Sequence, residues 1–204
     1  MESPPDRCTA FEGCRLIGSG PLAEVAVLAK AVADRPDHAP ILIFDDRSAE
    51  TIELDLHSAP ADLLARIAAK HAVPVAAPEL VRGPGRPKLG VVAREVTLLP
   101  HHWEWLADQP GGASVTLRKL VEQARRMNQG RDEIRRARDA LYRFTSVMAG
   151  NAPDFEAAMR ALFAGDRPRF EANTSAWPPD VRRHALAMAS AAFASTEQGA
   201  VSDV

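Results

Sequence analysis

The sequence has little cysteine and no long hydrophobic run. Cys8 and Cys14 are the only cysteines among 204 residues, too few for a disulfide scaffold or a structural zinc site, so we expect two free thiols. Apolar runs are only a few residues long, whereas about 18 apolar residues are needed to cross a bilayer. The first seven residues also lack the basic and apolar segments of a signal peptide. The sequence therefore predicts a cytoplasmic protein that makes no membrane contact.

The sequence also lacks the local motifs of common enzyme classes. It contains no phosphate-binding loop, dinucleotide fingerprint or nucleophile elbow. His101 and His102 are adjacent and so face different directions on a helix, whereas metal-binding pairs need a spacing of three or four. Asp45 and Asp46 follow a short apolar strand, where turn formation is favoured over magnesium binding. We therefore expect a protein that is not an enzyme and has no catalytic residue, no metal and no cofactor.

Positive charge is concentrated in the middle of the chain, although the formal net charge is only -2. Residues 82–143 carry 13 Lys/Arg against 7 Asp/Glu, whereas residues 1–81 carry 7 against 13 and residues 144–204 carry 5 against 7. Clustered positive charge in a chain of ordinary isoelectric point is typical of a polyanion-binding module, because phosphate contacts supply most of the nonspecific affinity for DNA. A solvated helix face is the alternative explanation of such a charge run.

Hydrophobic patterns predict a small α+β domain over residues 1–73. Two short strands around a turn at Glu12 and Gly13 are expected to form a hairpin. The order strand, strand, helix, strand, strand, helix indicates a mostly antiparallel sheet. The predicted strands are 7–11, 15–18, 41–44 and 51–56, and the predicted helices are 22–32, opened by Pro21, and 61–72.

The rest of the chain is predicted to be mostly helical. Four prolines and two glycines lie between Pro74 and Lys88, so residues 74–89 are expected to be an extended linker. A strand (91–98), a short helix (100–109) and a helix with Ser114 as its N-cap are expected within residues 90–130. Gly130 is expected to end that helix. Residues 131–194 form a helical C-terminal region with segments 132–148, 154–164 and 179–193, and residues 195–204 form a frayed tail.

A strand, a short helix, a glycine-containing turn and a longer helix follow one another within the 38 residues from Gly90 to Met127. This stretch is too short to bury a core of its own. Its residues Val-Thr-Leu-Leu-Pro-His-His-Trp-Glu-Trp-Leu (96–106) and Gly-Gly-Ala-Ser-Val-Thr-Leu-Arg-Lys-Leu-Val (111–121) resemble the ribbon-helix-helix fold of bacterial repressors and antitoxins. In that fold two chains pair their strands into a ribbon that lies in the major groove. The resemblance therefore implies a homodimer with DNA as its partner.

This resemblance implies which residues contact DNA. If Val96 and Leu98 face the core, Glu95 and Thr97 point toward DNA, where Glu95 can accept a hydrogen bond from cytosine but repels phosphates. Free N–H groups beside Ser114 can hold a phosphate, although an ordinary helix-turn-helix linkage explains this turn equally well. The basic residues expected to contact phosphates are Arg118, Lys119, Arg125 and Arg126.

Just before this segment, the sequence Arg82-Gly83-Pro84-Gly85-Arg86-Pro87-Lys88 resembles an AT-hook, whose Gly-Arg-Pro core places arginines in an A·T minor groove. Gly85, Arg86 and Pro87 match that core. An AT-hook usually has arginine directly before its glycine, and here Pro84 occupies that position. The resemblance implies minor-groove contacts from Arg82, Arg86 and Lys88, as expected for an arm beside a major-groove reader. A plain linker is the alternative.

Nearly the whole chain is also similar to an uncharacterised bacterial family, domain of unknown function 2239. The stretches that support this similarity are Thr-Ala-Phe-Glu-Gly (9–13), Lys-Leu-Gly-Val-Val-Ala-Arg-Glu-Val-Thr-Leu-Leu-Pro (88–100), His-Trp-Glu-Trp-Leu (102–106) and Phe-Glu-Ala-Ala-Met-Arg-Ala-Leu-Phe-Ala-Gly-Asp (155–166). The resemblance implies no particular activity.

These observations favour a DNA-binding protein of the transcriptional-regulator class. A structural or partner-binding protein is the alternative, in which residues 90–193 form one helical bundle whose basic face contacts an acidic protein surface. A small-molecule sensor or an enzyme is a third reading, because the first domain could enclose a pocket that a sequence cannot show.

Overall fold

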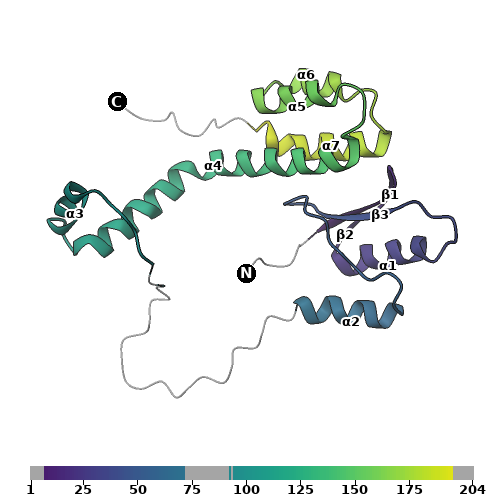
Figure 1. Ribbon diagram of the computed structural model, residues 1–204, viewed down its shortest axis with the longest axis horizontal. Coiled ribbons are helices and arrows are strands. Elements are labelled where there is room, and N and C mark those ends of the chain that lie inside the picture. Colours follow the sequence, from purple (N-terminus) through teal and green to yellow (C-terminus); the bar gives the residue numbers. More distant parts are fainter. Residues whose placement is uncertain (1–6, 72–91, 93, 195–204) are drawn as a thin grey trace, which may run out of the picture. The chain divides into compact units, whose positions relative to one another are not determined.

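The computed structural model describes residues 7–71, 92 and 94–194 (Figure 1). The chain divides into two compact units. We call residues 1–73 with 130–204 the sheet unit and residues 74–129 the small unit. The described elements are β1 (Cys8–Glu12), β2 (Arg15–Gly20), α1 (Leu22–Ala33), β3 (Ile41–Asp45), α2 (Pro60–His71), α3 (Pro100–Ala107), α4 (Gly112–Ala149), α5 (Phe155–Ala164), α6 (Arg167–Asn173) and α7 (Pro179–Ala192).

The sheet unit is built on three antiparallel strands in the order β2-β1-β3. The predicted hairpin is confirmed: β1 and β2 are joined by a tight turn in which Gly13 has φ +55, a conformation that favours glycine. All residues of the central strand β1 are buried, because β2 and β3 flank its edges and helices cover both faces. This arrangement confirms the predicted α+β class.

One face of the sheet packs against α1, and α1 in turn packs against α2. Figure 1 shows α1 between the sheet and α2. The apolar residues of α1 that recur at spacings of three and four supply the buried surface, as the sequence predicts. The buried residues of this core are Cys8, Ala10, Leu22, Val25, Ala26, Ala29, Ile43, Leu63 and Ile67.

The opposite face of the sheet packs against the C-terminal half of α4 and against α7. Phe144 of α4 lies between two sheet residues, with its ring 5.6 Å from that of Phe11 and 5.2 Å from that of Phe44. The backbone N–H of Leu16 in β2 also donates to the Asp180 carboxylate at 3.0 Å, which fixes the start of α7. The helices that follow residue 130 are therefore part of the same compact unit as the N-terminal sheet.

Three local predictions are wrong. Residues 51–56 do not form a strand: Thr51 makes one isolated bridge to Phe44, and the apolar residues that alternate after it pack against the α1 core from an extended loop. Gly130 does not end a helix, because α4 continues through it; a helical glycine costs about 1 kcal/mol, less than the surrounding helical residues contribute. Ser114 is the third residue of α4 and not its N-cap, since the helix begins at Gly112.

The short helix α6 is absent from the sequence prediction. Its N-cap is Asp166, whose carboxylate accepts a hydrogen bond from the Arg169 N–H at 3.1 Å, and Pro168 lies in its first turn. An acidic cap followed by proline was therefore the available signal. Gly165 separates α5 from α6 with φ +74.

Replacing Phe144 with alanine should lower the free energy of unfolding by about 3–5 kcal/mol, because a large aromatic side chain is removed from the core. Urea denaturation measures this loss. Val147, which is half exposed one turn along the same helix, provides the control: Val147→Ala should change stability by less than about 0.5 kcal/mol. Equal effects of the two substitutions would contradict the packing described here.

The stability of the sheet unit should fall as the pH drops below about 6.5. The His184 ring lies 4.6 Å from Phe144 and 5.6 Å from Phe11, and this burial lowers the pKa of His184 below its ordinary value of 6.5, opposed by the negative charge of Asp46. The unfolded chain therefore binds the proton more readily than the folded chain, so protonation favours unfolding. Urea midpoints between pH 8 and pH 5.5 measure this loss. His184→Gln should flatten the dependence, whereas His38→Gln, at an exposed site, should leave it intact.

Candidate nucleic-acid interface

The small unit leaves nearly all of its described side chains in contact with solvent. It contains α3, a turn in which Gly111 and Gly112 have φ +91 and +72, and the first half of α4. Among its described residues only Leu106 is buried. Its exposed large apolar side chains are Val92, Val96, Leu99, Trp103, Trp105, Leu120, Val121 and Met127. One copy of this unit therefore does not cover its own apolar surface.

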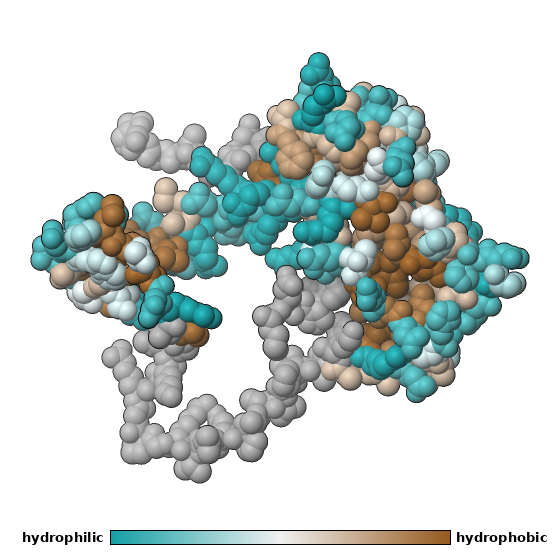
Figure 2. Space-filling view, in the orientation of Figure 1, coloured by the Kyte–Doolittle hydropathy of each residue, from teal (hydrophilic) through white to brown (hydrophobic). Residues whose placement is uncertain are grey.

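The first half of α4 has an apolar side and a basic side. At 100° per residue, Leu117, Leu120, Val121 and Ala124 fall on one side of the helix. The other side carries the cations predicted from the sequence to contact phosphates, and all of them are exposed. We call these four residues the basic face: Arg118, Lys119, Arg125 and Arg126. Figure 2 shows hydrophilic residues over the middle of α4 and hydrophobic ones toward its start and α3.

One carboxylate lies within the basic face. Glu122 accepts hydrogen bonds from Arg125 at 2.9 and 3.1 Å and from Arg126 at 3.0 Å. These bonds, first from Arg125 and then from Arg126, lower the pKa of Glu122, and the same pairing raises the pKa of Arg125. In the described part of the chain Arg118 and Lys119 pair with no carboxylate, so the basic face keeps a net positive charge.

The remaining predicted DNA-contacting residues are placed differently. Glu95 and Thr97 lie in an exposed segment without regular secondary structure, so the strand predicted for 91–98 is not present over its described residues. None of the described strands pairs with this segment, so its backbone makes no β-sheet hydrogen bonds with the described part of the chain. Ser114 lies in the first turn of α4, where its carbonyl accepts a hydrogen bond from Arg118 Nε at 3.1 Å. Arg82, Arg86 and Lys88 lie outside the described residues.

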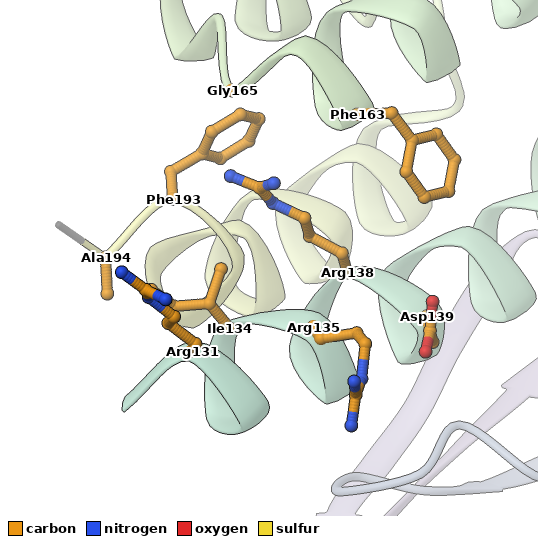
Figure 3. Close-up of a pocket in the computed structure, with 9 residues that line it drawn as sticks. All are labelled: Arg131, Ile134, Arg135, Arg138, Asp139, Phe163, Gly165, Phe193 and Ala194. Carbon is orange, nitrogen blue, oxygen red and sulfur yellow. The ribbon is translucent and has the colours of Figure 1, made fainter. Parts of the chain in front are cut away.

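A second cluster of cations lies in the sheet unit, and none of its members is among the residues predicted from the sequence to contact DNA. Arg131, Arg135 and Arg138 line a depression of about 570 Å³ together with Phe163 and Phe193 (Figure 3). The three arginines recur at spacings of four and three along α4, which places them on one side of the helix. That spacing was a usable signal, whereas the two aromatic residues are brought to the site by the packing of other helices.

A family profile described as an uncharacterised protein conserved in bacteria (DUF2239) matches residues 7–189. The chain belongs to the DUF2239 family. The DUF2239 match begins just before β1 and ends within α7, so it includes both units of the fold. No curated protein and no solved structure matches the chain.

Two further observations concern the described residues of this DUF2239 protein. Within residues 7–71, 92 and 94–194, no group of three or more His, Cys, Asp or Glu side chains is arranged to hold a metal ion. In the same residues no helix is both long and apolar enough to span a membrane.

Proposed function

We propose that this DUF2239 protein binds duplex DNA without acting as an enzyme and that the basic face of α4 contacts the DNA phosphates. The observation that supports the proposal is the charge of an exposed helical stretch: residues 112–131 contain five Lys/Arg and a single Asp/Glu, Glu122. Phosphate contacts of this kind supply most sequence-independent affinity for DNA.

The geometry of α4 suits this role. Its first half lacks buried side chains, so the helix offers most of its circumference to a partner. An α-helix with side chains is about 10–12 Å across and fits a major groove about 12 Å wide. Arg118 and Arg125 are seven residues apart, which places them on the same side of the helix and about 10 Å apart along its axis. Two guanidinium groups at that separation can reach successive phosphates on one strand.

We also propose that the DNA-binding form is a homodimer. The small unit exposes apolar surface on one side of α4 and at the tryptophans of α3, and monomeric proteins usually cover such surface. In the ribbon-helix-helix arrangement, a second copy would cover this surface and would pair with the segment around Val96, turning Glu95 and Thr97 toward the groove. The arms around Arg86 would then flank the paired strands.

A partner-binding function is the second candidate. Trp103 and Trp105 are 42% and 51% exposed, and tryptophan is enriched among the residues that dominate protein–protein binding. In this alternative an acidic protein contacts the basic face and the tryptophans together.

Charge reversal of the basic face tests the DNA proposal. In fluorescence-anisotropy titrations on random duplex, Arg118→Glu/Lys119→Glu should reduce affinity at least tenfold at low salt. It should also lower the slope of log K against log salt by about two, because each phosphate contact contributes about one. Arg160→Glu/Arg169→Glu makes the same change in net charge on exposed residues of the sheet unit and should have little effect. Absence of binding by folded wild-type protein at low salt would leave the partner-binding function.

The dimer is tested by light scattering, which should give twice the chain mass of 22.0 kDa. Val121 is 64% exposed on the apolar side of α4, so Val121→Glu should shift the mass toward one chain. Val147 is 50% exposed in the sheet unit, and Val147→Glu should leave the dimer intact. A wild-type protein that stays monomeric while it binds DNA would contradict the dimer alone.

A further inference from the structure

The sheet unit contains a depression lined by arginines and aromatic side chains, and two of these arginines, Arg131 and Arg138, pair with no carboxylate in the described part of the chain. It lies where the second half of α4 meets the turn after α5 and the residues that follow α7. Its volume of about 570 Å³ is within the range of small-molecule sites. We propose that this depression binds a nucleoside phosphate, with the phosphate on Arg131 and Arg138 and the base on Phe163.

Arg138 is the central cation of this arginine pocket. Its Nε donates to the Ala192 carbonyl at 3.0 Å, which holds the side chain against the end of α7 while its terminal nitrogens remain available. Figure 3 shows the guanidinium reaching between Phe193 and Phe163. A planar guanidinium held in place can bind phosphate through two parallel hydrogen bonds, and little further ordering is needed.

Gly165 leaves room for the Arg138 guanidinium. A Cβ atom at this position would lie 3.4 Å from Arg138 Nη2, and the backbone here has φ +74, which disfavours any other residue. Gly165 therefore has two roles: it allows α5 to end in a left-handed conformation, and it leaves space for the Arg138 guanidinium.

The charge of the pocket favours an anion. Arg135 is paired with Asp132 at 3.0 Å and points away from the phenyl rings in Figure 3. Arg131 and Arg138, in contrast, pair with no carboxylate among the described residues. These two positive charges can be neutralised by one phosphate group.

The other lining residues favour a nucleoside over free phosphate. Phe163 is 53% exposed, and the centre of its ring lies 5.7 Å from that of Tyr142. The exposed part of the Phe163 ring offers a surface on which a base can stack. Asp139 also lines the pocket and would repel a bare anion, but its carboxylate can accept hydrogen bonds from ribose hydroxyls. The phosphate, the ribose and the base of a nucleoside phosphate therefore each have a matching side chain: the arginines, Asp139 and Phe163, respectively.

Isothermal titration of the full-length protein with ADP, adenosine and inorganic phosphate tests this proposal. ADP should bind at least tenfold more tightly than either of the other two, because only ADP engages both the arginines and Phe163. Arg131→Gln and Arg138→Gln should each weaken ADP binding at least tenfold, and Phe163→Ala should weaken it severalfold. Arg131 is exposed, so its variant is expected to stay folded and remains informative if Arg138→Gln unfolds.

Two controls locate the binding. Arg160 is exposed on α5 and does not line the pocket, so Arg160→Gln should leave ADP affinity unchanged. Arg118→Glu/Lys119→Glu should also leave it unchanged, which separates this site from the basic face. No ADP binding at millimolar concentration would overturn the proposal. Equal affinity for phosphate and ADP would overturn the nucleoside, and loss of binding in either control would overturn the location.

Discussion

The contact of Phe144 with Phe11 and Phe44 is the interaction on which the sheet unit depends. It joins a helix that starts at residue 112 to strands that end before residue 46, and so connects distant parts of the sequence through one aromatic cluster. Because Phe144 fixes the second half of α4 on the sheet, Arg138 and Arg131, which lie earlier in that half, are presented beside the residues that follow α5 and α7. The pocket at Arg138 therefore depends on the same packing as the sheet.

The helices and strands whose formation depends on residues close to one another in the sequence could be predicted from the sequence. The β1–β2 hairpin, α1, β3 and α2 each have a local signal, such as the turn at Gly13 or the apolar spacing that begins at Leu22. A strand around Leu54 was expected from alternating apolar residues, but the structure has no strand there. Local sequence could not show this, because a strand forms only beside a partner strand and the sequence pattern does not specify that partner. Likewise, no local pattern could show that α7 covers the sheet, since that contact joins Leu16 to Asp180.

The same distinction holds for the candidate sites. The cations of the basic face could be identified from the sequence, because they lie on one exposed helix whose period orders them. The arginine pocket could not, since Phe163, Gly165 and Phe193 reach it from elements separated from Arg138 by many residues. Glu95 and Thr97 were assigned from a predicted strand that is not present over its described residues, because a strand needs a pairing partner that local sequence does not specify.

The two halves of α4 are stabilised in different ways, and this difference should be visible in amide hydrogen exchange. From Ala140 onward α4 packs into the aromatic core, so these amides should exchange only when the sheet unit unfolds. The first half has no buried side chains, so it lacks the tertiary packing that supplies most of the stability of a helix in a protein. Its amides should therefore exchange by local fraying. Any partner that covers this half, whether DNA or protein, should slow their exchange and leave that of β1 unchanged.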